Sequence, residues 1–348
     1  MALLALGLLS GCGSNAFQDK DGDGYSDQEE IEAGTDPQNP ASTPPPATPP
    51  PATPNFAITS VNTSVEECNP VPQNTITTAN ATGAVTYAIT GGVDATDFSI
   101  DATTGVVDYN GSTPDYEKKN SYVYEVTATD SGSGDTDVKT VTLTITNFQT
   151  TKNGFDYGCV TNDTTGEVWL DRNLGAAHIC TNMTDVACFG DYYQWGRGFD
   201  GHQDSTSGTV AILSPVEIAQ HGSFITYGSD WVSVDAVGLI RPSIWSASDG
   251  SSICPVGYRV PNEAELEAER NSWSSNNAAG AISGTVVWPA SGYRRRDTGN
   301  LARLGDRGYC WSYIPNATNS QALRFDAANG FVLAVQRAHG LPVRCIKN

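Results

Sequence analysis

Residues 122–128 read Tyr-Val-Tyr-Glu-Val-Thr-Ala, with an apolar or aromatic side chain at every second position. This two-residue period is that of a β-strand with one buried face. Further out along the chain, residues 85–90, 98–100, 105–107 and 138–145 form similar short runs, divided by turn-forming residues. In the last run, apolar side chains alternate with threonines. Several short strands within residues 55–147 predict an immunoglobulin-like β-sandwich.

The same span resembles a cadherin repeat. The matching stretches are Tyr87-Ala-Ile89, Phe98-Ser-Ile-Asp-Ala-Thr-Thr-Gly-Val106, Asp115-Tyr-Glu117 and Tyr124-Glu-Val-Thr-Ala-Thr-Asp130. The resemblance implies a calcium site, whose ligands would be Glu67, Asp115, Glu117 and Asp130. The repeat is single, however, and residues 146–148 stand where the family has an Asp-rich linker. A spacer sandwich without calcium is therefore the alternative, and homophilic adhesion of the cadherin type is not expected.

Residues 150–348 have a different composition. They hold all seven tryptophans and six of the eight cysteines. Short apolar runs at 168–170, 284–288 and 331–335 are divided by Gly, Ser and Asn, which predicts a loop-rich α+β domain. One helix is expected, because Asn262-Glu-Ala-Glu265 is a capping box followed by Leu266.

Seven stretches of this region resemble the Fibrobacter succinogenes major paralogous domain, in the same order and over nearly all of it. They are residues 168–175, 190–198, 200–203, 254–266, 290–294, 311–312 and 341–345. The pattern in 257–265 and the terminal Val343-Arg344 are also similar to the C-type-lectin-like fold, including its formylglycine-generating branch. The expected fold class is thus mainly β and multidomain: a cadherin-like sandwich, then a C-type-lectin-like domain over residues 150–348.

The cysteines predict disulfides in an oxidising compartment, because their spacing matches no zinc site. Cys180 and Cys188 enclose seven residues and can close a small loop. For Cys254 and Cys345, the lectin-like resemblance implies a bond between the helix start and the last strand. Two alternatives remain open for the others. Cys159 pairs with Cys310 and leaves Cys68 over, or it pairs with Cys68 and frees Cys310.

A stretch rich in arginine and aromatic residues lies late in this domain. Arg and aromatic side chains together bind acidic glycans, sugars and protein surfaces. The candidate ligand-binding residues are Tyr293, Arg294, Arg295, Arg296, Tyr309 and Trp311. The alternative is that Tyr309 and Trp311 belong to the core while the arginines are solvated.

The first thirteen residues read MALLALGLLSGCG. This apolar run is too short to span a bilayer and fits the hydrophobic part of an export signal. Its end, Leu9-Ser-Gly-Cys12, resembles the lipobox of bacterial lipoproteins, which implies a signal peptide over residues 1–11 and a lipid on Cys12. An ordinary signal peptide with a chance cysteine is the alternative. Gly13 and Ser14 imply, within that family, export to an outer membrane.

Residues 19–30 read Asp-Lys-Asp-Gly-Asp-Gly-Tyr-Ser-Asp-Gln-Glu-Glu, which is the ligand spacing of an EF-hand calcium loop. The expected Ca²⁺ ligands are Asp19, Asp21, Asp23, Asp27 and Glu30 through their carboxylates and Tyr25 through its carbonyl. The continuation to Pro37 resembles the thrombospondin type 3 repeats of bacterial surface proteins, which implies a calcium-stiffened stalk over residues 12–36. A solvated acidic tail is the alternative. Residues 37–54 contain nine of the 19 prolines and predict a polyproline spacer of roughly 55 Å.

Charge and the scattered reactive residues limit the function. Residues 1–149 hold 20 acidic and 4 basic residues, a net of −16, while residues 150–348 have a net of −4. This argues against nucleic acid as a partner. The four histidines lack the spacing of a metal site, and Cys310 and Cys345 do not form the reactive pair of the formylglycine-generating branch. We therefore expect no catalytic residues.

Together these features predict a calcium-binding lipoprotein anchored to the outer membrane or cell surface. It would act as an adhesin or display a binding module for an extracellular glycan or protein. A structural cell-envelope protein without a soluble ligand is the alternative, and an enzyme of the formylglycine-generating type is a third hypothesis.

Overall fold

The computed structural model describes residues 18–45, 55–59, 62–111, 113–219 and 221–348. Cys12 and residues 46–54 of the proline-rich linker lie outside the described residues. The chain divides into two compact units, Met1–Asn55 and Phe56–Asn348. No helix in the described ranges has both the length and the apolar character needed to cross a bilayer.

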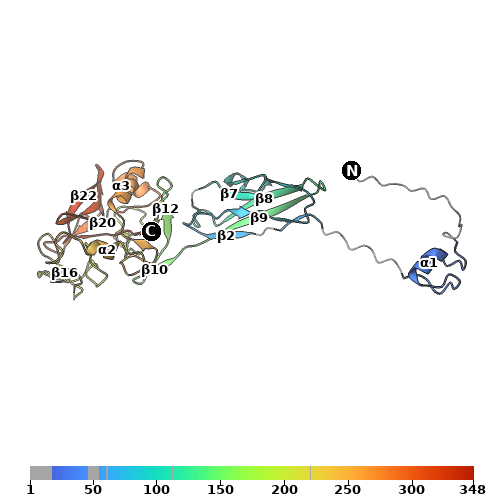
Figure 1. Ribbon diagram of the computed structural model, residues 1–348. Helices are drawn as coiled ribbons and strands as arrows, with labels where there is room; N and C mark the ends of the chain where they lie inside the picture. Colours follow the sequence, from blue (N-terminus) through green and yellow to red (C-terminus); the bar gives the residue numbers. More distant parts are fainter. Residues whose placement is uncertain (1–17, 46–54, 60–61, 112, 220) are drawn as a thin grey trace. The chain divides into compact units, whose positions relative to one another are not determined.

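The described part of the first unit is an acidic loop followed by helix α1, Asp27–Ala33 (Figure 1). The helix begins at a capping box, in which the Glu29 carboxylate accepts the Ser26 N–H at 2.9 Å and the Ser26 hydroxyl accepts the Glu29 N–H at 3.3 Å. It ends at Gly34, which adopts a left-handed φ of 78°. Such a short helix depends on its caps. Its buried residues, Asp27 and Glu30, are both expected calcium ligands.

Residues 56–147 form the predicted sandwich. The larger sheet has the strand order β2-β9-β8-β5 and the smaller has β3-β7-β6, with a further pair β1-β4 (Figure 1). β2 runs parallel to β9, and the remaining neighbours in these sheets are antiparallel. The bounds are β1 Ala57–Ile58, β2 Thr63–Glu66, β3 Asn74–Thr75, β4 Thr78–Ala79, β5 Val85–Gly91, 3₁₀ helix η1 Ala95–Asp97, β6 Phe98–Ile100, β7 Val106–Tyr109, β8 Ser121–Asp130 and β9 Thr136–Thr146.

The two-residue period of the sequence is confirmed in the two longest of these strands. Every second residue of β8, from Tyr122 to Asp130, is buried, and β9 buries Val141, Leu143 and Ile145. These side chains meet Phe98 of the smaller sheet, whose ring centroid lies 4.4 Å from that of Tyr124. Each large apolar side chain buried in this way stabilises the fold by roughly 1.5–3 kcal/mol.

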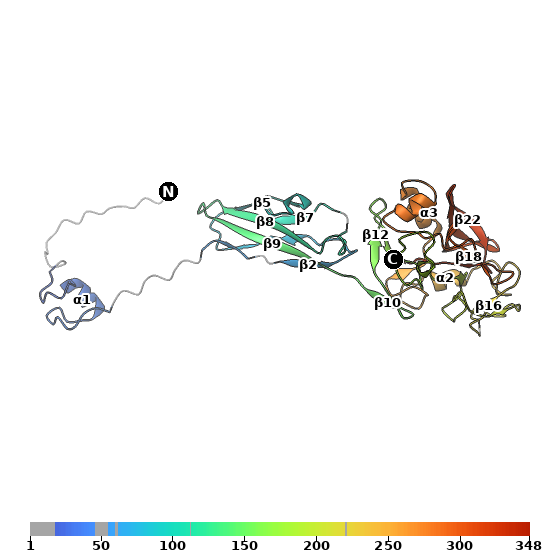
Figure 2. The same cartoon turned by 180° about the vertical axis from the view of Figure 1, so that it is seen from behind.

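The rest of the second unit is a loop-rich domain, which we call the head (Figure 2). Its sheets have the orders β12-β13-β24-β17, β14-β23-β18-β19 and β20-β21-β22, with the pairs β10-β11 and β15-β16. Its strands are β10 Thr150–Lys152, β11 Phe155–Tyr157, β12 Cys159–Thr161, β13 Val168–Leu170, β14 Tyr193–Gln194, β15 Thr209–Val210, β16 Phe224–Ile225, β17 Tyr258–Arg259, β18 Tyr293–Arg294, β19 Leu301–Ala302, β20 Arg307–Asn316, β21 Asn319–Asp326, β22 Gly330–Gln336, β23 Gly340–Leu341 and β24 Ile346–Lys347. Its helices are η2 Val186–Cys188, α2 Arg241–Trp245, α3 Glu263–Ser272 and α4 Ala278–Ser283.

The helix expected after Asn262 is confirmed. α3 begins at a capping box formed by Asn262 and Glu265 and packs against β20, β21 and β22. The apolar run 331–335 lies in β22 and the run 168–170 is β13, whereas the run 284–288 is a loop that buries Val286 and Trp288 against Leu266 of α3. The head therefore buries aromatic side chains from loops as well as from strands; Trp195, Trp231 and Trp288 lie outside any strand or helix.

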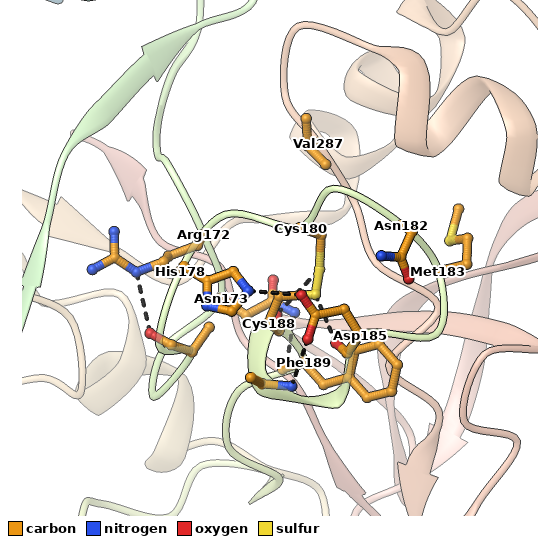
Figure 3. The surroundings of a disulfide bond; sticks show 12 residues. Arg172, Asn173, His178, Cys180, Asn182, Met183, Asp185, Cys188, Phe189 and Val287 are labelled. Carbon is orange, nitrogen blue, oxygen red and sulfur yellow. Dashed lines mark hydrogen bonds and ion pairs between the residues drawn. A yellow bond between two sulfur atoms is a disulfide. The ribbon is translucent and has the colours of Figure 1, made fainter.

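Three disulfides lie among the described residues, and two of them join cysteines 91 positions apart in the sequence. Cys254 is bonded to Cys345, and Cys180 to Cys188 (Figure 3). A third disulfide joins Cys68 of the sandwich to Cys159 of the head, while Cys310 is a buried free thiol. Of the two alternatives that the sequence left open, the structure contains the bond between Cys68 and Cys159.

The sandwich and the head also meet through side chains. Lys347 Nζ donates to Asn69 Oδ1 at 2.6 Å and to the Cys68 carbonyl at 3.2 Å. Phe148, which directly follows the sandwich, packs its ring on that of Tyr258 of the head, with the centroids 5.9 Å apart. The joint between the two domains is thus fixed by a covalent bond, by hydrogen bonds of a lysine and by an aromatic contact.

Candidate functional site

The acidic loop before α1 gathers carboxylates around a tight turn. The carboxylate oxygens of Asp19, Asp21 and Asp23 lie within 4.8 Å of one another. The turn is held by the N–H groups of Gly22 and Gly24, which donate to the two Asp19 oxygens at 2.6 and 3.1 Å. Both glycines have positive φ, 78° and 100°, a conformation that residues with a Cβ rarely adopt. The sequence therefore folds the loop so that its acidic side chains converge.

Several oxygens of this loop are buried without a hydrogen-bond partner in the described structure. They are Oδ2 of Asp21, Oδ2 of Asp23 and both carboxylate oxygens of Glu30. Burial and the neighbouring acids Asp21 and Asp23 raise the pKa of Glu30, and burial together with Asp23 and Asp19 raises that of Asp21. Buried, unpartnered carboxylates are costly because they repel one another and have lost water. Ca²⁺ takes six to eight such hard oxygen ligands, so the residues present fit calcium.

Asp27 differs from the other acids of the loop. Lys20 Nζ lies 2.8 Å from its carboxylate, and this ion pair lowers the pKa of Asp27. Position nine of an EF-hand loop often binds the ion through water, so a partly neutralised carboxylate is acceptable there. Lys20 is about half exposed.

The second expected calcium site is brought together only in part. Carboxylate oxygens of Glu67, Asp115 and Glu117 lie within 4.8 Å of one another, but Asp130 is not among them. Asp130 ends β8, while Asp115 and Glu117 precede its start, and a strand of that length extends roughly 30 Å. The inclusion of Asp130 is therefore corrected. Its carboxylate accepts the N–H groups of Thr82 and Gly83, both at 2.8 Å, and that of Gly132 at 3.0 Å, which hold a turn; the bonds from Thr82 and Gly132 lower its pKa.

The carboxylates of this partial cluster already have partners. The two oxygens of Glu67 accept the N–H groups of Tyr116 and Phe148, both at 2.9 Å, although burial raises its pKa. Asp115 forms an ion pair with Lys118 at 3.2 Å. Glu67 thus bonds two backbone N–H groups at the end of the sandwich. Its charge is already partly compensated, so a cation would stabilise it less than it would stabilise the unpartnered carboxylates before α1.

The predicted arginine and aromatic surface of the head does not form as one exposed patch. Trp311 is fully buried, and its Nε1 donates to the Tyr193 carbonyl at 2.8 Å. Arg294 is 2% exposed, because its guanidinium donates to the carbonyls of Gly299, Asp204 and Ser207. These two residues are corrected from ligand contacts to parts of the core.

Arg295 and Arg296 lie closer to solvent. Arg295 is exposed and donates to both oxygens of Asp297, and Arg296 donates to the carbonyl of Gly228. Both guanidinium groups thus have partners within the head, and neither residue lines the pocket beside Tyr293.

Tyr293 and Tyr309 line a pocket of about 340 Å³. The other residues that line it are Asn319, Leu333, Ala334, Val335, Gln336, His339 and Leu341. Sequence reasoning missed them. They come from β21, β22, β23 and the turn before β23, and no local pattern marks that these segments meet Tyr293 of β18.

The cysteines of the head lie in settings that do not favour reactivity. Cys345 is bonded to Cys254, and burial raises the pKa of the Cys310 thiol to about 12. Figure 3 shows the other disulfide within the head, between Cys180 and Cys188. The loop that it closes contains Asp185, whose Oδ2 lies 2.7 Å from His178 Nε2.

Comparison with known proteins gives one family match. Residues 19–40 match the family described as the bacterial TSP3 repeat, a calcium-binding repeat, which covers the acidic loop and α1. No curated protein matches the chain.

Solved structures of protocadherins are similar to part of this chain. Cadherin domains 3–6 of protocadherin gamma B2 are 19% identical, with a TM-score of 0.22, over 28% of this chain and 25% of that one. Human protocadherin-24 EC1-2 is 18% identical, with a TM-score of 0.23, over 26% of this chain and 43% of that one. Mouse protocadherin gamma C3 EC1-3 is 17% identical, with a TM-score of 0.23, over 26% of this chain and 33% of that one. The chain spans less than half the length of these structures. The comparisons thus show that residues 19–40 are similar to a bacterial TSP3 repeat, while the mainly β, multidomain fold is seen in the structure itself.

Proposed function

We propose that this protein is a calcium-binding adhesin or display protein of a bacterial surface. A lipid on Cys12 holds the chain at an outer membrane or cell surface, and the loop at residues 19–30 binds Ca²⁺. Residues 37–54 act as a spacer, and the head over residues 150–348 presents a binding site for a glycan or protein. The observation that carries the proposal is the group of buried, unpartnered carboxylate oxygens in the loop, within a segment that matches a bacterial TSP3 repeat.

Calcium is the best-supported part of this proposal. A Ca²⁺ ion would bind the carboxylates of Asp19, Asp21, Asp23 and Glu30 and the carbonyl of Tyr25, with Asp27 reaching it directly or through water. When bound, the ion supplies positive charge among acids that otherwise repel one another, so it stabilises the loop and α1 by mass action. A weaker second site at Glu67, Asp115 and Glu117 belongs to the same proposal.

The test begins with the purified chain and calcium. We expect saturable binding by isothermal titration calorimetry, in the range of about 0.1–1 mM typical of extracellular modules. Replacing Asp21 with Asn should weaken the tighter phase, while replacing Asp115 with Asn should affect a weaker phase alone. Failure of the wild-type chain to bind Ca²⁺ at several millimolar would contradict the proposal.

The anchor is tested in bacteria that express the full chain. We expect a clickable palmitate analogue to label the wild-type protein and to be lost in Cys12→Ala. Cys310→Ala is the matched control, because it also removes a cysteine that is outside the three disulfides. Labelling that persists in Cys12→Ala would exclude the proposed lipid site. Protease treatment of intact cells then shows whether the head faces outward.

A structural envelope protein is the second candidate, and one observation favours it. The bond between Cys68 and Cys159, with the hydrogen bonds of Lys347, fixes the sandwich to the head. Two domains joined by a disulfide suit a load-bearing role as well as display. Cells that express the full chain and bind no more host or bacterial surface than cells without it would favour this candidate.

A further inference from the structure

The three-stranded sheet of the head has one covered edge and one open edge. β20 lies at the covered edge, where the N–H groups of Trp311 and Tyr313 donate to the carbonyls of Pro342 and Pro261, both at 3.0 Å. β22 lies at the other edge, and β21 is its only neighbour among the described strands. Both views of the chain place β22 at the margin of the head (Figures 1 and 2).

The register shows which backbone groups of β22 face outward. At the turn between β21 and β22, the Asp326 N–H donates to the Asn329 carbonyl at 2.9 Å. Bonded pairs recur at every second residue of an antiparallel pair, so the odd-numbered residues of β22 bond β21. The N–H and C=O groups of Val332 and Ala334 therefore point away from the sheet. Among the described residues, no backbone or side-chain group bonds these four groups.

β22 lacks the features that usually protect an exposed edge. Residues 327–336 contain no charged residue and no proline, and the pairing of β22 with β21 has no bulge. The charged side chains beside the strand have partners within the head. Arg324 is bonded to Asp326. Arg296 donates to the Gly228 carbonyl, and the buried Arg337 donates to several carbonyls. An open, regular and uncharged edge of this kind accepts a further strand.

One face of β22 is apolar and only partly covered. Phe331, Leu333 and Val335 alternate along it, on the sheet face that also carries Tyr309. Phe331 is 36% exposed. Leu333 and Val335 line the pocket of about 340 Å³ beside Tyr293. A strand that pairs with β22 thus meets an apolar row, so its own side chains on that face have to be apolar as well.

We propose that β22 pairs with β22 of a second copy of this chain. The two strands run antiparallel about a two-fold axis at Leu333. Val332 and Ala334 of each copy then exchange backbone hydrogen bonds with Ala334 and Val332 of the other. Phe331 of each copy stands opposite Val335 of the other, on the face that carries the pocket. One register thus bonds the free backbone groups, covers both exposed rings and puts an aromatic side chain beside each pocket.

A second copy fits this edge because both sides of the contact need the same properties. The incoming strand has to have a free edge, no charge and apolar side chains at every second position, and β22 itself has all three. The net charge of −20 repels a second copy at long range, but physiological salt screens that repulsion beyond about 8 Å. A contact through seven residues is smaller than the roughly 1,200 Å² that stable complexes bury, so we expect a Kd on the order of 100 µM. The inference goes beyond the proposed function, since it concerns contacts between heads.

Sedimentation equilibrium of the full chain carrying Cys12→Ala, over about 5–500 µM, measures the association. We expect a monomer–dimer equilibrium. Ala334→Pro removes an outward N–H that bonds nothing in β21, so the variant keeps its fold, and the Kd should rise at least about tenfold. Phe331→Ser should raise the Kd at least about threefold, because the ring no longer packs on the second copy.

The control for Phe331→Ser is Leu239→Ser. Leu239 is 78% exposed and lies on the head outside β22, so its substitution should leave the Kd unchanged. Near-ultraviolet circular dichroism checks that each variant is folded.

Engineered cysteines, added to the Cys12→Ala chain, test the register. Across the two-fold axis the Cα atoms of the two copies of residue 333 would lie about 4.5 Å apart, which a disulfide can span. Leu333→Cys should therefore form a covalent dimer when oxidised with copper phenanthroline. Ala334→Cys is the matched control: its two copies would be separated by more than about 7 Å, which a disulfide cannot bridge. Dimer bands on a non-reducing gel give the result.

Three results would overturn the proposal. The first is a folded chain that stays monomeric over the whole concentration range. The second is a dimer that Ala334→Pro leaves intact, or that Leu239→Ser weakens as much as Phe331→Ser does. The third is a covalent dimer of Ala334→Cys in place of Leu333→Cys. None of these measurements depends on Ca²⁺ or on the lipid, so the proposed function and this contact can fail separately.

Discussion

The acidic loop and the head differ in whether their buried charged groups have partners within the protein. In the loop, carboxylate oxygens of Asp21, Asp23 and Glu30 are buried beside one another without partners. In the head, guanidinium groups are buried just as deeply, yet they donate to backbone carbonyls and carboxylates of the same domain. Those arginines are Arg197, Arg241, Arg294, Arg337 and Arg344. Charges with internal partners belong to the architecture, whereas a cluster of one sign without partners indicates an ion from outside.

Arg241 shows the internal case most clearly. Its guanidinium donates to the two oxygens of Asp230 at 2.8 and 2.7 Å and to Asp235 at 3.1 Å, and it lies over the Trp195 ring. Asp235 is itself almost fully buried. No motif in the sequence predicted this network, because Asp230, Asp235 and Arg241 are brought together by the fold of an irregular loop.

The largest effect is expected from Arg241→Met. The substitution keeps most of the side-chain volume but leaves Asp235 buried without its cation, which should lower the free energy of unfolding by about 3–5 kcal/mol. Denaturant unfolding of the full chain, followed by tryptophan fluorescence, measures it. Arg295→Met is the control, since Arg295 and Asp297 form an exposed pair worth at most about 1 kcal/mol. Equal, small effects of both variants would contradict the distinction drawn above.

The range over which residues interact decides what the sequence could predict. The calcium loop was predictable residue by residue, because all its ligands lie within twelve positions and the turn glycines between them set the geometry. The strand period of β8 and the capping box of α3 were predictable for the same local reason. Asp130 was misplaced, because a motif does not state which end of a strand a residue occupies.

For the head, the sequence predicted the fold class, a loop-rich α+β domain, but not which residues meet in it. The burial of Trp311 and Arg294 depends on carbonyls more than eighty residues away in the sequence, such as those of Tyr193 and Asp204. The bond between Cys68 and Cys159 likewise depends on how two domains meet. The pocket beside Tyr293 is formed by strands that no single stretch of sequence brings together.

The second prediction concerns the loop. Glu30→Gln removes one negative charge and one strong ligand oxygen from the cluster, so we expect the calcium Kd to rise at least about tenfold, or about 1.4 kcal/mol. Calorimetry of the full chain measures the change. Glu32→Gln is the control: it removes the same charge from an exposed position of α1. If both variants weaken calcium equally, the effect is one of net charge alone, and Glu30 is not a ligand.

The third prediction is the pH dependence of calcium binding. The pKa of Glu30 is raised above its usual value, so in the calcium-free chain the proton stabilises the folded loop, and that stabilisation is lost as the pH rises through the folded pKa. Calcium and the proton compete for the same oxygens. We therefore expect the calcium Kd to rise as the pH falls below neutral, and to begin rising at a higher pH than it would with a glutamate of ordinary pKa. Titrations at several pH values measure this, and an unchanged Kd would show that Glu30 does not bind the ion.

The smallest effect is expected at Lys20, the only basic residue of the loop. Its ammonium group lies 2.8 Å from Asp27 and supplies part of the positive charge that calcium would otherwise provide. Because Lys20 is about half exposed, the pair contributes only about 0.2–1 kcal/mol. Lys20→Ala should thus tighten calcium binding by a factor of roughly 1.4 to 5, since Asp27 becomes free to turn towards the ion. Calorimetry against Lys139→Ala, which changes the net charge equally but lies at an exposed position of β9 in the sandwich, separates this local effect from the general one. Weaker calcium binding in Lys20→Ala would mean that Lys20 shapes the loop for the ion, and the loop would then share the internal pairing that distinguishes the head.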